Sequence, residues 1–356
     1  MAESLEDALI GSLLATAVGD ALGLPFEGMS RRRAEKYHGS LNAYSFLGSY
    51  GMLSDDSEHA CITAQSLICS GGDLEKFARD LSRRLRWWLL ALPAGTGRAT
   101  LFSIVKMWLG FSWKSSGVFS AGNGPAMRSA IIGLYCQGDS KLIEDFVNAS
   151  AVMTHSDPKA SIASFAIAWA ASRAMESSDV QAPEFVLELR EILGKRKGFS
   201  EFDALLEKVL ASVEAGESSV DFACSIGQGG GVSGYIYATV PVVLQTWLRH
   251  QGDLEGALKE VICCGGDSDS TAAILGSIIG ARVGLGGISD EWLDRLLAWP
   301  MTVSWIKNLG KVLTEAARER ESKDPRDIPF IYTCVRNAVF FVLVLSHGFR
   351  RLLPPY

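Results

Sequence analysis

Two segments of this chain are apolar around the whole circumference of a helix, at residues 5–18 and 271–283. Both carry small residues spaced four positions apart: Gly11 and Ala15 in the first, with Gly19 directly after it, and Gly276 and Gly280 in the second. A helix that is apolar on every face must be buried. Because glycine costs a helix about 1 kcal/mol relative to alanine, we expect these small residues to allow close packing of two central helices.

Helical periodicity extends over most of the remaining chain, and no run of alternating residues predicts a strand. We expect further helices at 58–70, 74–92, 125–137, 140–154, 158–176, 183–193, 201–215, 235–250, 253–263, 291–298 and 303–321. The more polar stretch 183–216 is expected to lie at the periphery. The sequence therefore predicts an all-α fold, a compact orthogonal multi-helix domain over residues 1–321.

The C-terminal residues 322–356 are expected to form a short apolar extension packed on this domain. A proline-broken segment, 322–332, leads into it. The most apolar run, 338–346, is far shorter than the ~20 residues that a membrane span needs. We therefore expect a buried C-terminal helix and no association with a membrane.

Charge and cysteine content narrow the class of protein. The chain has 356 residues and a net charge of −6, which disfavours unspecific binding to nucleic acids but leaves open a nucleotide-sized anion held by backbone amides. Seven scattered cysteines, an odd number without a CxxC pair, are typical of reduced thiols. The acidic N-terminus lacks the basic start of a signal peptide. We expect a cytoplasmic protein, and a monomer.

Two clusters of acidic and hydroxyl residues precede predicted helices: Ser54-Asp55-Asp56-Ser57 and Asp267-Ser268-Asp269-Ser270. Such residues are ordinary helix caps, and carboxylates at a helix start are favourable to the helix dipole. However, one cap residue satisfies a helix start, whereas each cluster offers two carboxylates. Oxygen-only ligands suit Mg²⁺ or Mn²⁺. If the clusters converge, their four carboxylates and hydroxyls could hold two divalent ions about 4 Å apart.

The chain resembles the ADP-ribosylglycohydrolase family, whose founding bacterial member reactivates dinitrogenase reductase. The resemblance covers roughly residues 5–290 and rests on five blocks that occur in the same order. They are GS at 11–12 with GDALGLPFE at 19–27, SDDS at 54–57, GNGPAMR at 122–128, TH at 154–155 with Pro158, and GGDSDSTAA at 265–273. Any one block is weak evidence, whereas five in register are strong.

The resemblance implies an all-α ADP-ribosylglycohydrolase-like domain with a dinuclear Mg²⁺ centre. Its metal ligands correspond to Ser54, Asp55, Asp56, Asp267, Asp269 and Ser270. The chain departs from the family pattern by having serine in place of threonine at 54, 57 and 270, which keeps the hydroxyl, and by having His59 where methionine is common. These departures leave the subfamily, and hence the substrate, open.

Further residues are expected to contact ADP-ribose. Glycines let a backbone approach a ligand, and free amides at a helix start suit a phosphate, although a plain turn would use the same residues. By resemblance we assign substrate binding to Gly122, Asn123, Gly124, His155, Gly230 and Tyr235. His155 and Tyr235 could equally be structural residues of the core, and Asp20 could either support the metal ligands or cap a turn.

The expected activity is Mg²⁺-dependent hydrolysis of the glycosidic bond at C1″ of ADP-ribose, in an ADP-ribosylated protein or small-molecule conjugate. A water activated by the metal or by a carboxylate would attack C1″. The candidate catalytic residues are Glu27, Asp56 and Asp269, and Glu27 could equally be a solvated loop acid. Two alternatives are a catalytically silent ADP-ribose- or nucleotide-binding module, and a helical scaffold whose acidic clusters are only caps.

Overall fold

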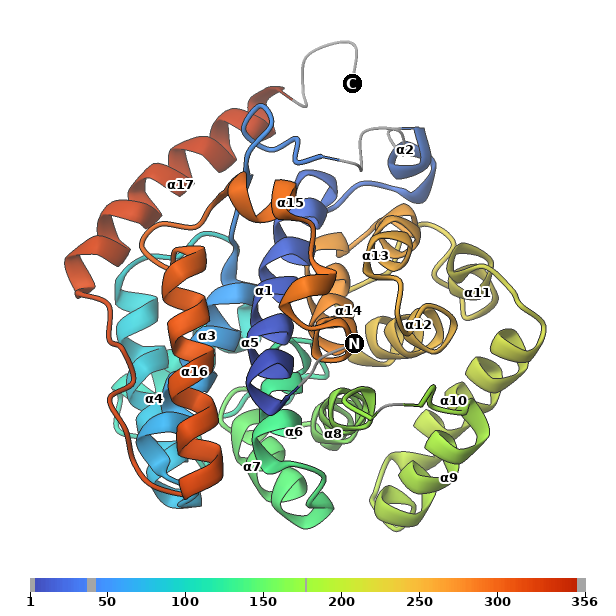
Figure 1. The fold of residues 1–356 in the computed structure, drawn as a ribbon, viewed down its shortest axis with the longest axis horizontal. Helices are drawn as coiled ribbons and strands as arrows, with labels where there is room; N and C mark the ends of the chain where they lie inside the picture. The colour runs from blue at the N-terminus through green and yellow to red at the C-terminus, as the bar shows by residue number, and fades with distance from the viewer. Residues whose placement is uncertain (1–3, 37–42, 177, 351–356) are drawn as a thin grey trace.

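The computed structural model describes residues 4–36, 43–176 and 178–350. These residues form an almost entirely helical body, as predicted (Figure 1). The α-helices are α1 (Leu5–Gly23), α2 (Arg31–Lys36), α3 (Asp55–Ser70), α4 (Leu74–Leu90), α5 (Arg98–Trp108), α6 (Ala130–Cys136), α7 (Ser140–Val152), α8 (Pro158–Ala174), α9 (Ala182–Leu193), α10 (Phe199–Glu214), α11 (Ser219–Ser225), α12 (Ile236–Arg249), α13 (Leu254–Cys263), α14 (Ser268–Val283), α15 (Asp290–Asp294), α16 (Val303–Glu319) and α17 (Phe330–Arg350). Short 3₁₀ turns are η1 (Leu24–Phe26), η3 (Ala126–Arg128) and η4 (Leu285–Gly287).

Helices α1 and α14 lie side by side at the centre of the molecule (Figure 1). A Cβ atom added to Gly19 would lie 2.3 Å from the carbonyl oxygen of Ala272, and one added to Gly276 would lie 2.3 Å from that of Ala15. No real Cβ atom approaches a carbonyl so closely, so both positions require glycine. The predicted close packing of the two apolar helices is therefore confirmed.

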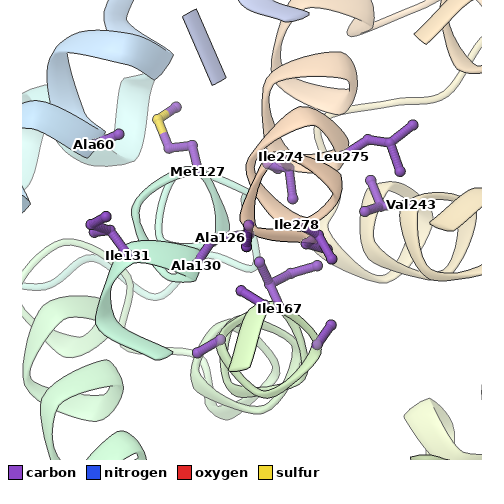
Figure 2. Packing of buried hydrophobic residues seen from close by; sticks show 14 of the residues in the cluster. Ala60, Ala126, Met127, Ala130, Ile131, Ile167, Val243, Ile274, Leu275 and Ile278 are labelled. Atoms are coloured by element: carbon purple, nitrogen blue, oxygen red, sulfur yellow. The ribbon is translucent and has the colours of Figure 1, made fainter. Parts of the chain in front are cut away.

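The remaining helices enclose this central pair. Figure 2 shows Ile274 and Ile278 of α14 among apolar side chains of neighbouring elements, including Ile167 of α8, Val243 of α12 and Met127 of η3. Helices α9 and α10 lie at the edge of the molecule, where the polar stretch 183–216 was expected (Figure 1). Buried apolar residues thus hold α14 on several sides and fix the position of its first turn.

Some local predictions were wrong. The helix expected at 291–298 is only the short α15, because strand β2 (Leu296–Leu297) instead pairs in parallel with β1 (Gly51–Met52). Helices α2, α5 and α11 were not predicted. The exposed faces of α5 carry several large apolar side chains, such as Phe102 and Val105, which obscure an amphipathic pattern.

The predicted burial of the C-terminal helix is also wrong. Helix α17 begins earlier than expected, and most of its apolar side chains are exposed. By length and composition alone, two helical segments of the described chain could cross a membrane: Leu5–Phe26, which is completely buried, and Phe330–Phe349, of which 17% is buried. The first is the core helix α1, so of these two helices it is α17 that presents apolar side chains to its surroundings.

Candidate active site

The two acidic clusters meet at the first turns of α3 and α14. The Ser270 hydroxyl donates a hydrogen bond to Asp56 Oδ2 at 3.1 Å, across 214 positions of sequence. The negative charges of Asp55 and Asp267 act on Asp56, and those of Asp56 and Asp267 act on Asp269. The structure therefore brings both clusters into one site, with two helix N-termini directed toward it.

The first turn of α3 is held in place by α1. Ser54 is the N-cap, and its hydroxyl accepts from the Asp56 N–H at 3.4 Å. Asp20 Oδ2 accepts from the N–H groups of Ser54, at 2.8 Å, and of Ser57, at 3.2 Å, and also from the Ser57 hydroxyl. Capping therefore occupies Ser54, whereas Asp55 and Asp56 are not needed for it.

Asp267 occupies the N-cap position of α14, but its side chain makes no capping hydrogen bond. Instead its Oδ2 accepts from the Asn123 side-chain amide at 2.6 Å, and Asn123 also donates to the Thr239 hydroxyl at 3.2 Å. The Asp267 N–H donates to the Val232 carbonyl at 2.7 Å. The carboxylate is thus oriented by a distant loop rather than used to start its own helix, which argues against the capping interpretation.

The carboxylates of the site differ in how deeply they are buried. Asp20, Asp56 and Asp269 are buried, Asp55 and Asp267 are partly buried, and Glu27 is exposed. Burial, and then the negative charge of Asp55, raises the pKa of Asp56 well above its ordinary value. Burial, and then the charge of Glu27, does the same to the pKa of Asp269. A site with this much unbalanced negative charge favours protons or cations.

Among the residues that the structure describes, three buried carboxylate oxygens have no hydrogen-bond partner: Oδ1 of Asp20, of Asp56 and of Asp269. An unpaired buried carboxylate is costly, so a positive partner is expected. The donors are all oxygen, which suits a hard divalent cation rather than zinc. In the part of the chain that the structure describes, however, no three His, Cys, Asp or Glu side chains are arranged in a ready-made metal-binding group. The chemistry of these residues fits a cation, and the hydroxyls of Ser54 and Ser270 add two neutral oxygens.

The Gly122–Gly124 loop lies directly against this site. The Asn123 N–H donates to the Gly234 carbonyl at 2.9 Å, and Gly122 pairs with Tyr235. A Cβ atom at Gly122 would lie 2.9 Å from Nε2 of His155, and one at Gly124 would lie 3.2 Å from its Cε1. The absence of side chains at the two glycines therefore makes room for the imidazole ring beneath the loop.

His155 is buried and neutral. Its Nδ1 lies 2.9 Å from the Thr154 hydroxyl, which also accepts a 2.7 Å hydrogen bond from the Arg128 guanidinium. Burial, together with the positive charge of Arg128, lowers the pKa of His155 to about 3. Arg128 is itself fully buried and also donates to Ser150. This network fixes the ring under the glycine loop, an ordering role that the sequence did not indicate for Arg128.

Tyr235 and Gly230 lie at the exposed side. The Tyr235 hydroxyl donates to Glu201 at 3.1 Å and accepts from Lys159 at 2.9 Å. A Cβ atom added to Gly230 would have no neighbouring atom within 4 Å, and the Gly230 carbonyl accepts from the Arg31 N–H at 3.3 Å. The structure thus places both residues at the surface. The Tyr235 hydroxyl is hydrogen-bonded to both members of the Lys159–Glu201 ion pair, which sequence reasoning missed.

Glu27 is held near the site by the backbone hydrogen bonds of the two residues that follow it. The Gly28 N–H donates to the Gly266 carbonyl at 2.7 Å, and the Gly266 N–H donates to the Met29 carbonyl at 2.8 Å. The loop after η1 is therefore bound to the loop before α14. This pairing places the charge of Glu27 near Asp269 and Asp55.

The sequence profile of the ADP-ribosylglycohydrolase family matches residues 1–323 of this chain. The chain belongs to the ADP-ribosylglycohydrolase family. All of the acidic and glycine loops described above fall within the matched residues. Only the last part of the chain, which includes α17, lies beyond them.

Individual relatives agree with this membership. The chain is 32% identical to an uncharacterized protein of Archaeoglobus fulgidus over 82% of its own length and 92% of that protein. It is 26% identical to the ADP-ribosyl-[dinitrogen reductase] glycohydrolase of Rhodospirillum rubrum over 82% of its length and 91% of the relative. It is 26% identical to an ADP-ribosylarginine hydrolase of Serratia proteamaculans over 90% of its length and 82% of the relative.

A solved structure described as an ADP-ribosylglycohydrolase-related protein complex has the same fold, with a TM-score of 0.63. The two chains are 24% identical, and the match covers 88% of this chain and 99% of the other. This similarity supports the all-α ADP-ribosylglycohydrolase fold expected from the sequence.

Proposed function

We propose that this family member hydrolyses the glycosidic bond at C1″ of ADP-ribose in ADP-ribosylated proteins or small-molecule conjugates. Membership of the ADP-ribosylglycohydrolase family supports this reaction class, as do the names of two relatives. The observation that carries the proposal is the meeting of Asp56 and Ser270 in a site with unpaired buried carboxylate oxygens. Such a site has a need for positive charge that a helical scaffold with simple caps would not have.

We further propose that Asp55, Asp56, Asp267 and Asp269, with the hydroxyls of Ser54 and Ser270, hold Mg²⁺, in two positions as the family resemblance implies. Mn²⁺ has the same preference for oxygen ligands and could substitute. Bound there, the metal would supply positive charge and a template for the ribose hydroxyls beside the scissile bond.

Three further side chains of the protein have proposed roles at this site. Asp20 keeps the first turn of α3 in position through the Ser54 and Ser57 N–H groups. Asn123 orients the Asp267 carboxylate. Glu27 is exposed, and its charge acts on Asp269. It is therefore the group best placed to exchange a proton with water or the leaving group, because that role needs access to solvent and substrate.

The exposed side of the site is proposed to receive ADP-ribose. Gly122 and Gly124 are partly exposed, and Gly230 and Tyr235 are exposed. Gly122 pairs with Tyr235, and the neighbouring Asn123 contacts the Asp267 carboxylate. His155, neutral beneath the loop, would support the loop's backbone rather than supply a charge. The candidate linkages are those to arginine, to serine, to another side chain, to an acetyl group and to a nucleobase, and the substrate panel below tests the arginine, serine and acetyl linkages.

The test is a panel of defined substrates incubated with the purified chain, with Mg²⁺ or with EDTA. Peptides ADP-ribosylated on arginine and on serine, and O-acetyl-ADP-ribose, are compared by mass spectrometry of released ADP-ribose. Because even partners that only orient metal ligands contribute about 10–100-fold, Asp269→Asn should lose about a hundredfold or more. The matched control is Asp139→Asn, because Asp139 is an exposed N-cap on α7 and asparagine caps as well as aspartate.

Each outcome decides between the alternatives. Release of ADP-ribose by the wild type and by Asp139→Asn, but not by Asp269→Asn, supports the proposal. Tight binding of ADP-ribose without cleavage of any linkage would make the chain a silent binding module. Full activity in EDTA would refute the role of the metal while leaving hydrolysis intact.

A further inference from the structure

Helix α17 is attached to the domain by its polar side chains. The Arg336 guanidinium lies 2.7 Å from Glu58 Oε1 and also donates to the Leu53 carbonyl. The Asn337 amide donates to the Ala91 carbonyl at 2.9 Å. Phe340 is buried beside these residues. One stripe of the helix therefore faces the protein, and this stripe contains the only charged residue between positions 330 and 349.

The opposite stripe of α17 is apolar and faces outward. Its six central members are Ile331, Val335, Ala338, Val342, Leu345 and Phe349, all exposed, with exposed fractions of 60% for Val342 and 66% for Phe349. Tyr332, Val339 and Phe341 beside them are exposed as well. A surface helix of an isolated protein has the reverse arrangement, with apolar residues inward and charges outward. Figure 1 shows α17 on the outer side of the molecule. The outward stripe is therefore unlike an ordinary solvated face.

The spacing of this stripe indicates what covers it. Its six residues are separated by four, three, four, three and four positions, which is the 3.5-residue repeat of a seam between two helices. Val335, Val342 and Phe349 share one seam position, and Ile331, Ala338 and Leu345 share the other, so both positions are apolar, as a seam between two helices requires. Helices that lie in a membrane surface carry Lys and Arg on a solvated polar face, whereas Arg336 and Asn337 of α17 are bonded to the domain.

We infer that α17 is a dimerisation helix, and that a second copy of this chain covers its outward stripe about a two-fold axis. The same patch faces itself across such an axis. The absence of charged residues from the exposed positions between 330 and 349 avoids repulsion between like charges at that contact. This inference replaces the expectation of a monomer, and it does not depend on the proposed hydrolase activity.

The apolar surface continues beyond the start of α17. The ring of Phe330 lies 5.4 Å from that of Trp87 on α4, and Trp87 lies 6.3 Å from Trp108 on α5. All three rings are more than two fifths exposed. A helix of this length is about 30 Å long, and a stable interface buries about 800 Å² on each partner. These aromatic residues provide additional area next to the seam.

The test is the mass of the full chain in solution, by light scattering after size-exclusion chromatography. The wild type is expected at twice the chain mass of 38.4 kDa. The double variant V335E/V342E should halve that mass, because it places four carboxylates in the two-fold contact. The matched control is Leu187→Glu, an exposed apolar residue on the distant α9, which should remain dimeric.

Circular dichroism and the thermal midpoint verify that each variant is folded. A dimer that survives V335E/V342E would overturn the inference, as would a wild type that is monomeric at all concentrations tested. Vesicles of phosphatidylcholine provide a further comparison. If the monomeric wild type binds the vesicles and V335E/V342E does not, then α17 is a bilayer-docking face and the dimer proposal is wrong.

Discussion

The carboxylate of Asp20 on α1 accepts a 2.8 Å hydrogen bond from the backbone N–H of Ser54, the residue that caps α3. The same oxygen also accepts from the N–H of Ser57. The central helix α1 thus determines where the first turn of α3 lies, and it packs against α14, which carries the other acidic cluster. The candidate site is therefore assembled by the core and not by its surface loops alone.

Removing the Asp20 carboxylate should destabilise this junction. Asp20→Ala leaves two buried N–H groups without an acceptor, so we expect the free energy of unfolding to fall by about 2 kcal/mol or more. Asp20→Asn keeps one acceptor oxygen and should cost less. Urea denaturation in EDTA measures both. Equal stability of Asp20→Ala and Asp20→Asn, which both remove the charge, would show that the hydrogen bonds to Asp20 do not support the turn.

Glycine at position 19 should be indispensable. An alanine Cβ there would lie 2.3 Å from the carbonyl oxygen of Ala272, so α1 and α14 would have to separate. We expect Gly19→Ala to cost about 1–3 kcal/mol or more. Gly348→Ala is the matched control, because Gly348 lies in α17 with no neighbouring atom within 4 Å. There alanine should stabilise the helix, by up to about 1 kcal/mol. Urea denaturation of both variants distinguishes close packing from a general intolerance of alanine.

The centre of the fold could be predicted because its signals are local. The apolar circumference of α1 and α14 and their spaced glycines are written in short stretches of sequence, and both had to be buried. The acidic clusters could also be recognised in the sequence, but the sequence alone did not show that the two clusters meet in space. The hydrogen bond from Ser270 to Asp56 depends on how two helices pack, which no local pattern specifies.

Other features could not be predicted because they depend on tertiary partners. Arg128 stands in a motif that suggests a ligand loop, yet it is fully buried and donates to the hydroxyls of Ser150 and Thr154. The apolar residues of α17 suggested burial, whereas the polar Arg336 and Asn337 face the domain and most of the apolar residues are exposed. Hydrophobicity alone cannot reveal that a distant glutamate, Glu58, is available to receive that arginine.

The Arg336–Glu58 pair should be important for attaching α17. Glu58 is buried and also accepts from the Trp88 indole at 2.6 Å. Arg336→Met would leave this carboxylate without its cation, and breaking a buried pair in this way costs about 3–5 kcal/mol. The double variant R336M/E58Q should recover part of the loss, because no uncompensated charge remains. A thermodynamic cycle from urea denaturation measures the coupling, and purely additive losses would argue against a cooperating pair.

Glu260 on α13 should make stability depend on pH. Burial alone would raise its pKa, but hydrogen bonds from His250, the Ser219 N–H and Arg249 lower the pKa to about 2. The folded carboxylate thus binds a proton less readily than the unfolded one. Its contribution to stability is present above the unfolded pKa of about 4.5 and is lost as the pH falls toward 2.

We therefore expect Glu260→Gln to lower the free energy of unfolding by about 2 kcal/mol near neutral pH. The difference from the wild type should begin to narrow below about pH 5, because the wild type then loses the advantage of its ionised carboxylate. Urea denaturation at neutral pH and at two acidic values measures this. Glu255→Gln on the same helix is the control, since its exposed pair with Lys259 should contribute less than about 1 kcal/mol. A difference for Glu260→Gln that stays constant down to about pH 4 would contradict the assignment of the lowered pKa to Glu260.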